Sequence, residues 1–461
     1  MNDFIRFDRD LIDRYDCTGP RYTSYPSAAQ FDGNFSSQDY ARIALATNQT
    51  LRPLSLYFHI PFCSTVCFYC ACNKIVTKNR SRAIPYLEHL YREIVLQSHL
   101  YDPDRPVLQL HWGGGTPTFI SDTQMNELMD MTHRHFHMLA DDSGEYSIEI
   151  DPREADRHTI RLLRRLGFNR LSVGIQDFDP HVQQAVNRLQ TYKQTHEVLD
   201  AARHEGFKSV SVDLIYGLPH QSVDSFSRTL EKVINLSPDR LSVFNYAHLP
   251  KRFKTQRQIR ESDIPSAGTK LDILGRVISM LTSAGYIYVG MDHFAKPTDE
   301  LVRAQRTRTL HRNFQGYSTH AECDLVGMGL TGISMVGNCY SQNSSDIDEY
   351  YALTGADQIP VCRGIELDWD DRLRRDILLE LMCHCSLDIA ELERDWGIEF
   401  LSYFNSERSR LEALQDDGLL TIDEKRIDVL PAGRLLIRNI CMIFDRYLHA
   451  TPSIERFSRT I

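Results

Sequence analysis

From Leu54 onward, short apolar runs alternate with longer segments whose apolar residues recur every three or four positions. The short runs predict buried strands and the longer segments predict helices, because side chains repeat every 2 residues in a strand and every 3.6 in a helix. The expected strands are residues 54–62, 107–113, 146–151, 170–177, 208–216 and 240–247. The expected helices are residues 83–99, 121–139, 154–166, 191–205, 222–235 and 268–284.

This alternation predicts an α/β fold. Six strand–helix units in a row indicate parallel strands joined by right-handed crossovers. A closed TIM barrel needs eight such units, so we expect an open, six-stranded parallel (βα)6 partial TIM barrel over residues 51–296. Functional residues of such barrels lie at the C-terminal ends of the strands.

The chain on either side of this region has a different pattern. Residues 1–50 predict an N-terminal arm, whose stretch 19–26 (GPRYTSYP) is extended and too polar to bury itself, and we expect the arm to cover the active site. Residues 297–461 predict a mostly helical C-terminal domain. Its expected elements are helices at 371–385, 389–396, 406–416 and 431–448 and strands at 419–422 and 426–429, with a further edge strand at 285–290 before the domain. Helix, hairpin and helix in this order resemble a winged helix, a shape used either to bind DNA or to pack against other domains.

Composition limits the classes of function. The chain has 461 residues, 42% of them hydrophobic and 25% charged, which is ordinary for a globular protein. Its net charge of −10 argues against a nucleic-acid or anionic-membrane partner, and favours packing over DNA binding for the winged helix. The chain has no run of about 18 apolar residues, so we expect no membrane-spanning segment. Residues 1–16 are charged throughout and unlike a signal peptide, so we expect a cytoplasmic protein.

The clearest chemistry lies in residues 63–72, CSTVCFYCAC, directly after the first expected strand. Cys63, Cys67 and Cys70 have the spacing C-x3-C-x2-C. Three thiolates on one short loop can hold three corners of a [4Fe–4S] cluster and leave the fourth iron open to another ligand. The alternative is a structural zinc loop, but zinc prefers four ligands, usually in two pairs, and the chain has no second C-x2-C pair. The 11 cysteines, an odd number, do not suggest a disulfide framework.

Polar and glycine-rich segments follow the other expected strands. The second strand runs into His111-Trp-Gly-Gly-Gly-Thr-Pro117, where three glycines allow close approach to a ligand. Polar residues near later strand ends are Glu149, Gln176, Arg188, Asp213 and Asn245. Taken singly, each is more simply a hydrogen-bonded or helix-capping side chain, but together they favour a binding site beside the cysteine loop. The apolar segment Gly327–Ile333 would suit packing on an adenine ring, or is simply a tight turn.

These motifs resemble the radical S-adenosyl-L-methionine (SAM) superfamily and, within it, the family of oxygen-independent coproporphyrinogen III oxidases, also called coproporphyrinogen dehydrogenases. The resemblance extends over nearly the whole chain. Besides the cysteine loop it is carried by PRYTSYP (20–26), YFHIPFC (57–63), HWGGGTPT (111–118), DPRE (151–154), GIQDF (174–178), DLIYGLP (213–219), RLSVFNYAHLP (240–250), GMDHFA (290–295), HRNFQGY (311–317), LLIRNICM (435–442) and FSR (457–459).

The resemblance implies an oxidoreductase of porphyrin (haem) biosynthesis. It would oxidatively decarboxylate the ring A and ring B propionates of coproporphyrinogen III to vinyl groups, giving protoporphyrinogen IX. A [4Fe–4S] cluster with one open iron would bind Cys63, Cys67 and Cys70, and two SAM molecules would bind beside it. The iron-bound SAM would contact Tyr57, Gly114, Glu149 and Ile333. The second SAM would contact Tyr69, Cys70, Ala71, Gly115, Thr116, Gln176, Arg188, Asp213 and Ala247.

The family's reaction also needs a low-potential electron donor such as flavodoxin or ferredoxin, and we expect a monomer. Two other classes of protein stay open. A haem-binding, chaperone-like paralogue would share YxHIPxC, the three cysteines and GGGTP, but such paralogues usually have an aromatic residue in place of Cys72 and lack the PRYTSYP arm. An electron-transfer protein would need a fourth cluster ligand, for which Cys72 is the only nearby candidate. As a free thiol, Cys72 is instead a candidate catalytic residue, with side-chain packing as its alternative role.

Overall fold

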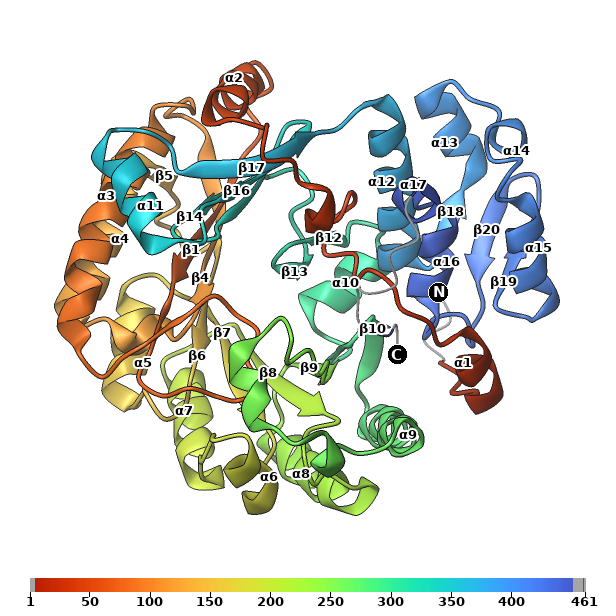
Figure 1. Cartoon of the computed structure of the whole chain (residues 1–461), viewed down its shortest axis with the longest axis horizontal. Helices are drawn as coiled ribbons and strands as arrows, with labels where there is room; N and C mark the ends of the chain where they lie inside the picture. The colour runs from red at the N-terminus through yellow and green to blue at the C-terminus, as the bar shows by residue number, and fades with distance from the viewer. Residues whose placement is uncertain (1–4, 451–458, 460–461) are drawn as a thin grey trace. The chain divides into compact units, whose positions relative to one another are not determined.

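The computed structural model describes residues 5–450 and 459 (Figure 1). The chain forms two compact units that interleave along the sequence. The barrel unit comprises residues 31–269 and 322–366, and the C-terminal unit comprises residues 1–30, 270–321 and 367–461. The arm expected at residues 1–50 is therefore divided between the two units. The FSR motif at 457–459 lies mostly outside the described residues.

Six parallel strands form the centre of the barrel unit. They are β1 (Leu54–Ile60), β4 (Pro106–Gly114), β6 (Glu145–Ile150), β7 (Arg170–Gln176), β8 (Ser209–Tyr216) and β9 (Arg240–Asn245). Each pairs in parallel with the next one along the chain. The connecting helices are α3 (Ala83–Ser98), α4 (Asp122–His135), α5 (Arg157–Arg165), α7 (Tyr192–His204) and α8 (Val223–Leu236), which lie along the outside of the strands in Figure 1. This arrangement confirms the open six-stranded α/β barrel.

The local sequence explains why these helices begin where they do. The Ser121 hydroxyl oxygen accepts a hydrogen bond from the amide of Gln124, and the Gln124 side-chain oxygen accepts one from the amide of Ser121. Thr191 and Gln194 form the same reciprocal pair before α7. Such capping boxes satisfy amides that have no partner within the helix, and a serine or threonine three residues before a glutamine is readable in the sequence.

The sheet continues beyond β1 with strands that the sequence analysis did not predict. β14 (Asp324–Met328) pairs in parallel with the free side of β1. Three antiparallel strands follow, β15 (Ile333–Val336), β16 (Cys339–Asn343) and β17 (Val361–Glu366), with α11 (Ile347–Gly355) before the last. The expectation of loops and helices was therefore wrong for residues 324–366. These strands are short, and segments such as Cys339–Asn343 owe their strand form to pairing rather than to a local apolar pattern.

The barrel unit also contains smaller elements. They are α2 (Ser37–Thr47), β2 (Phe62–Cys63), β3 (Ile75–Val76), β5 (His137–Met138) and α6 (Pro180–Ala185). Of these, β2 and β3 matter most for the site, because they pair in parallel at the two ends of the cysteine loop.

The C-terminal unit contains a three-stranded sheet with the strand order β18-β20-β19. Its elements from residue 367 onward are α12 (Trp369–His384), β18 (Ser386–Asp388), α13 (Ile389–Trp396), α14 (Phe400–Tyr403), α15 (Arg408–Asp416), β19 (Leu420–Ile422), β20 (Arg426–Val429), α16 (Ile437–Ile443) and α17 (Arg446–Ala450). The earlier ones are α1 (Arg9–Tyr15), α9 (Ala267–Ser283, which begins at the end of the barrel unit), β10 (Ile287–Gly290), β11 (His293–Ala295), α10 (Glu300–Arg306), β12 (His311–Asn313) and β13 (Gly316–Ser318). The elements from α12 to β20 follow the order of a winged helix: one helix, one strand, further helices and a two-stranded hairpin.

The single helix expected at residues 431–448 is wrong. Residues 431–436 form turns, α16 ends at Ile443 and α17 begins at Arg446. The break has a local cause, because the Asp445 carboxylate accepts a hydrogen bond from the amide of Tyr447 at 2.9 Å. An aspartate in this position caps a new helix start.

The PRYTSYP segment belongs to the core of the C-terminal unit. Tyr22 and Tyr25 are 1% and 2% exposed and pack with apolar residues of α12 and α16. The Tyr22 hydroxyl donates a hydrogen bond to the Asp445 carboxylate at 2.9 Å. The expectation that this segment is too polar to bury itself was wrong for its tyrosines, because a buried hydroxyl is tolerated where it has a hydrogen-bond partner.

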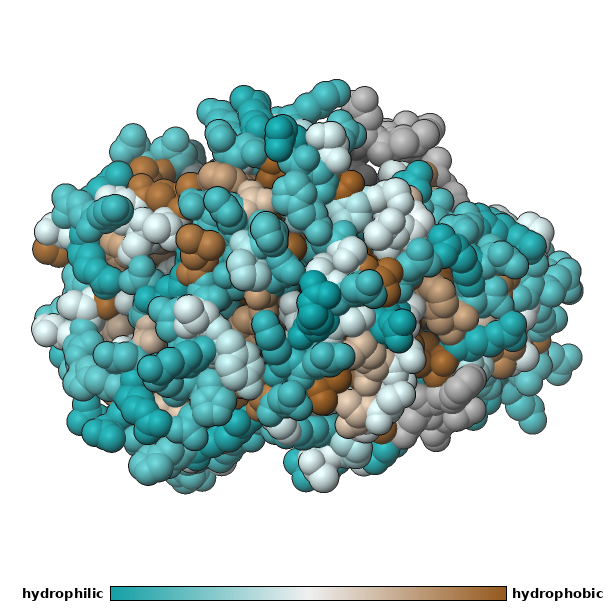
Figure 2. All heavy atoms as spheres, turned by 90° about the horizontal axis from the view of Figure 1, so that it is seen from below, coloured by the Kyte–Doolittle hydropathy of each residue, from teal (hydrophilic) through white to brown (hydrophobic). Residues whose placement is uncertain are grey.

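The face of the molecule shown in Figure 2 is mostly hydrophilic, with hydrophobic residues in small scattered groups. Within residues 5–450 and 459, no helix has the length and apolar character needed to cross a membrane.

Candidate cofactor site

The cysteine loop connects β2 to β3 at the C-terminal end of β1. Cys63 and Cys70 are half-buried, and Cys67 is buried. Backbone hydrogen bonds hold the loop in place, from the Cys70 amide to the Cys67 carbonyl (3.2 Å) and from the Phe68 amide to the Val186 carbonyl (3.0 Å). The expected metal ligands therefore lie together at the end of the barrel where functional groups gather.

Side chains from other parts of the barrel unit donate hydrogen bonds to the sulfurs of Cys63 and Cys67. The Thr116 hydroxyl donates to Cys63 Sγ at 3.6 Å. The guanidinium groups of Arg153 and Arg188 each donate to Cys67 Sγ, also at 3.6 Å. Burial raises the pKa of the Cys63 thiol to about 11, and the bond from Thr116 opposes this shift. Nearby positive charge and hydrogen-bond donors stabilise the thiolate, which is the form of cysteine that binds iron. Hydrogen bonds to the sulfurs also tune the reduction potential of an iron–sulfur cluster.

Cys70 and Cys72 are neighbours whose pKa values shift in opposite directions. The hydrogen bond between their side chains lowers the pKa of Cys70 to about 6, helped by Lys74, and raises the pKa of Cys72. The two shifts have opposite directions because the two side chains share one hydrogen bond. Cys70 stays a predicted cluster ligand, and Cys72 stays a predicted free thiol beside it.

The glycines after Trp112 allow β4 to approach the ends of β1 and β6. A Cβ atom on Gly114 would lie 2.7 Å from the His59 ring, and one on Gly115 would lie 2.6 Å from the Phe62 carbonyl oxygen. Gly114 also has a φ of 109°, which favours glycine. Only glycine fits these positions, so the motif forms a backbone cradle beside the cysteine loop.

Glu149 on β6 lies against this cradle. Its carboxylate accepts a hydrogen bond from the Gly114 amide at 3.2 Å and is 3.4 Å from His111 Nε2. Burial acts to raise the pKa of Glu149, but the bonds from His111 and Gly114 outweigh it, and the pKa lies below its ordinary value. Glu149 is therefore a carboxylate that can accept further hydrogen bonds from a cationic or hydroxyl-bearing ligand.

Tyr57 and Ile333 lie near the same strand ends. The Tyr57 ring stacks on His111 with ring centroids 5.8 Å apart. Tyr57 also pairs across the sheet with Gly327 of β14, and the Ile333 backbone packs so closely on Gly327 that a Cβ there would lie 2.4 Å from the Ile333 oxygen. The structure thus brings Tyr57, Gly114, Glu149 and Ile333 close to the C-terminal ends of neighbouring strands.

Arg188 is the centre of a second group. Its guanidinium donates to the Asp151 carboxylate at 2.9 Å and to the Gly174 carbonyl at 2.7 Å. Arg153 also binds Asp151, and despite burial the two arginines lower the pKa of Asp151 to about 2. Arg188 Nε and Gln176 Oε1 are buried and have no hydrogen-bond partner within the described part of the chain. Unpartnered buried polar atoms beside a backbone cradle fit the presence of a polar ligand.

Asp213 and Ala247 complete the expected set. Asp213 lies on β8 opposite Gly174 of β7 and accepts a hydrogen bond from Ser172 at 3.1 Å. Burial and the nearby charge of Glu149 raise the pKa of Asp213 to about 6. The Gln256 side chain donates to the carbonyls of Ala247 (3.2 Å) and Tyr69 (2.9 Å), and so connects the loop after β9 to the cysteine loop.

The sequence analysis missed one functional candidate, Arg153. Its guanidinium bonds both Cys67 Sγ and Asp151, so it lies next to the expected cluster. A signal was present, because the charged segment DPRE at 151–154 directly follows the third strand, but by itself such a segment is equally typical of helix capping.

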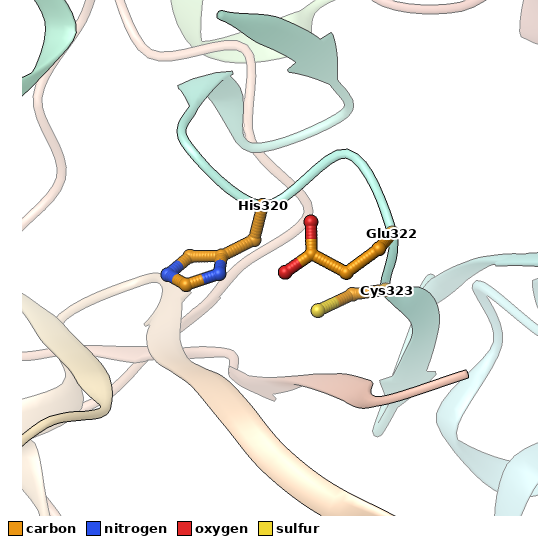
Figure 3. A group of neighbouring side chains, drawn as sticks. All are labelled: His320, Glu322 and Cys323. Atoms are coloured by element: carbon orange, nitrogen blue, oxygen red, sulfur yellow. The ribbon is translucent and has the colours of Figure 1, made fainter. Parts of the chain in front are cut away.

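A different group of possible metal ligands lies on the loop before β14. His320, Glu322 and Cys323 offer ligand atoms within 4.8 Å of one another, and their side chains gather on one side of the loop in Figure 3. Glu322 is exposed and His320 is partly exposed. Exposed groups of this kind are common without a metal, so they carry no assignment.

Comparison with known proteins identifies relatives along the whole chain. Residues 57–233 match the family model of the radical SAM superfamily, and residues 367–436 match that of the HemN C-terminal domain. The oxygen-independent coproporphyrinogen III oxidase of Pseudomonas aeruginosa is 53% identical, with 100% of both chains covered, and that of Escherichia coli is 49% identical, with 99% of both covered. The solved structure titled "Coproporphyrinogen III oxidase (HemN) from Escherichia coli is a Radical SAM enzyme" superposes with a TM-score of 0.92 at 48% identity, covering 96% of this chain and 100% of that one. The similarity therefore includes both units and the cysteine loop.

Proposed function

Since the chain belongs to the family of oxygen-independent coproporphyrinogen III oxidases, we propose that it converts the ring A and ring B propionates of coproporphyrinogen III to vinyl groups. The product is protoporphyrinogen IX, an intermediate of anaerobic haem biosynthesis. In each conversion a –CH2–CH2–COO⁻ group becomes –CH=CH2, with release of carbon dioxide, one proton and two electrons. The observation that carries the proposal is full-length similarity to these oxidases, including the C-x3-C-x2-C loop at the barrel end.

Members of the radical SAM superfamily use a [4Fe–4S] cluster and SAM, and the residues of this chain fit both. When bound, these cofactors supply the one-electron chemistry that removes a hydrogen atom from an unactivated carbon, which no side-chain base can do at neutral pH. We assign Cys63, Cys67 and Cys70 as the cluster ligands. Thr116, Arg153 and Arg188 donate hydrogen bonds to their sulfurs and so stabilise the negative charge of the ligand set.

We assign two SAM sites to the two groups of strand-end residues. The iron-bound SAM would lie against Tyr57, Gly114, Glu149 and Ile333, where the Glu149 carboxylate can accept hydrogen bonds from its amino group. The second SAM would lie against Tyr69, Cys70, Ala71, Gly115, Thr116, Gln176, Arg188, Asp213 and Ala247. The unpartnered atoms Arg188 Nε and Gln176 Oε1 support this second site, because a bound carboxylate and amine would satisfy them.

Four further parts of the proposal concern the surroundings of the site. The arm, residues 1–50, covers the tetrapyrrole during reaction. A low-potential protein such as flavodoxin or ferredoxin supplies electrons. The enzyme works as a monomer in the cytoplasm, which is a reducing compartment, and this location fits the finding that none of its 11 cysteines, all within the described residues, forms a disulfide.

The test is an anaerobic assay of the purified, reconstituted protein with coproporphyrinogen III, SAM and a chemical reductant. The tetrapyrrole products are oxidised to porphyrins and separated chromatographically. We expect SAM-dependent formation of protoporphyrin together with a tricarboxylic intermediate. Retention of haem without any decarboxylation would refute the proposal and identify the chain as a haem-binding paralogue.

A further inference from the structure

The C-terminal unit contains a cavity of about 340 Å³. It lies where α10 and α12 end and where β18 pairs with β20. Its charged and polar lining is dominated by arginines, and consists of Arg306, Arg308, Arg426, Arg434, His384, Cys385, Ser386 and Asp428. This cavity shares no residue with the cofactor site. A ligand bound in the cavity would therefore have a role separate from the reaction proposed above.

The lining of the cavity contains more cationic than anionic side chains. Its four guanidinium groups face one lining carboxylate, that of Asp428, which pairs with Arg426 at 3.0 Å. Glu380, outside the lining, forms an ion pair with Arg308. The carbonyl end of α12 adds only about half a negative charge. Guanidinium groups therefore outnumber carboxylates on the walls of this space, a distribution that attracts anions.

His384 supplies an independent sign of a missing partner. Its side chain is 3% exposed, and its Nδ1 atom is buried without a hydrogen-bond partner in the described part of the chain. A buried polar atom left unsatisfied is destabilising, so a ligand atom in the cavity would offset that cost.

A neighbouring hydroxyl also has a proton to donate. Ser386 Oγ accepts a hydrogen bond from Arg308 at 2.7 Å, which leaves the hydroxyl hydrogen of Ser386 available to a ligand. Arg434, 3% exposed, has a fixed position because its guanidinium donates to the Tyr288 carbonyl at 2.9 Å. Cationic groups, a hydroxyl and an imidazole therefore converge on one space.

We propose that this cavity binds a small organic anion with two or more negative charges, of the phosphate-ester or polycarboxylate class. Guanidinium groups recognise both oxyanions through paired hydrogen bonds. The volume lies at the lower end of the range for ligand pockets, so the ligand is small. Val429 and Pro431 give the cavity an apolar wall for the carbon part of the ligand.

The test is isothermal titration of the full-length, cluster-containing protein under anaerobic conditions at constant ionic strength. Pyrophosphate and citrate are the probes, and they distinguish the two classes of oxyanion. We expect saturable 1:1 binding of at least one probe. Arg426→Gln should weaken binding roughly tenfold, the value of one charge-assisted hydrogen bond, and Asp428→Asn should tighten it because a repelling carboxylate is removed.

Arg408→Gln is the matched control. Arg408 is about as exposed as Arg426 and also pairs with a carboxylate, that of Glu412, but it does not line the cavity. The proposal is overturned if neither probe saturates, or if Arg408→Gln and Arg426→Gln weaken binding equally. Hydrogen exchange gives a second measurement that needs no variant, because bound probe should slow exchange in residues 384–386 and 426–434. Unchanged exchange at saturating probe would also overturn the proposal.

Discussion

Arg188 and Asp151 form a buried ion pair in the cofactor site, with Nη1 and Oδ2 2.9 Å apart and both side chains less than one-tenth exposed. The second terminal nitrogen of Arg188 donates to the Gly174 carbonyl at 2.7 Å. Two acceptors in different directions therefore determine how the guanidinium is oriented. Lysine has one nitrogen and cannot satisfy both acceptors from the same position.

We therefore predict that Arg188→Lys keeps the [4Fe–4S] cluster and loses decarboxylation, because the charge is retained while the fixed geometry is lost. Equilibrium binding of SAM should fall from two molecules per chain to one. Arg164→Lys is the control, since Arg164 also makes two bonds to an aspartate, Asp142, but lies on α5 away from the cysteines. A wild-type chain that binds only one SAM would disprove the second site.

The three proposed cluster ligands give a second prediction. Replacement of Cys63, Cys67 or Cys70 by serine should abolish most bound iron and sulfide and the visible absorption of the cluster, because each supplies one of only three protein thiolates. Cys362→Ser is the control, since Cys362 is also half-buried in the barrel unit but lies on β17. Full iron content in any one of the three ligand variants would exclude that cysteine as a ligand.

Cys72 should behave differently from these ligands. Cys72→Ser leaves three thiolates in place, so cluster content and SAM binding should be unchanged. If the thiol takes part in electron removal from the substrate radical, the variant should cleave SAM without forming product. The measurement is the ratio of 5′-deoxyadenosine to protoporphyrinogen, which should rise several-fold. An unchanged rate and ratio would assign Cys72 to packing.

Glu93 of α3 makes the stability of the barrel unit depend on pH. Burial raises its pKa from 4.5 to about 7, although Gly329, Tyr350 and Asn343 all donate hydrogen bonds to it. Between pH 4.5 and about 7 the folded state binds more protons than the unfolded state. The free energy of unfolding therefore falls as pH rises through this window. The loss for Glu93 is roughly 3 kcal/mol when complete, from 1.4 kcal/mol for each unit of pKa.

We predict that Glu93→Gln flattens the dependence of stability on pH between about 4.5 and 8. The check is urea unfolding at several pH values, followed by a signal from the barrel unit. Glu88→Gln changes an exposed glutamate of the same helix and should leave the wild-type slope intact. A Glu93→Gln variant with the wild-type slope would show that another group causes the dependence.

The Tyr22 hydroxyl provides a test of how the arm contributes to the C-terminal unit. Tyr22→Phe removes the bond to Asp445 inside the core and should destabilise this unit by about 1–2 kcal/mol. Tyr403→Phe also removes a tyrosine–aspartate bond, to Asp370, but Tyr403 is 39% exposed and the loss should be smaller. Equal losses in the two variants would contradict a core role for Tyr22. Deletion of residues 1–26 would remove Tyr22 and Tyr25 together, so it should unfold part of this unit. Under the covering role proposed for the arm, the deletion should also lower turnover.

Local patterns explain how much of the fold the sequence predicts. The six central strands, the helices that connect them and α9 were expected within a few residues, because each has its own apolar periodicity and several have caps within three residues of their start. The short elements β2, β3, β5 and α6 were not expected, and β5 lies within the helix expected at 121–139. The cysteine loop is equally local, since the spacing of Cys63, Cys67 and Cys70 is enough to suggest a cluster with an open iron. Many motifs along the chain match one family at once, and their combination is specific enough to identify that family from the residues alone.

Contacts between distant residues were decided only by the tertiary structure. β14 is a strand because it pairs with β1, and no local signal in the sequence encodes that pairing. The paired residues Leu54 and Asp324 are 270 positions apart in the chain. The donors on Cys67 come from Arg153 and Arg188, and the buried position of Tyr22 depends on Asp445, more than 400 residues away. Sequence periodicity reports which face of an element is apolar, whereas the partner of that face, and the polar groups that meet there, follow from how the whole chain packs.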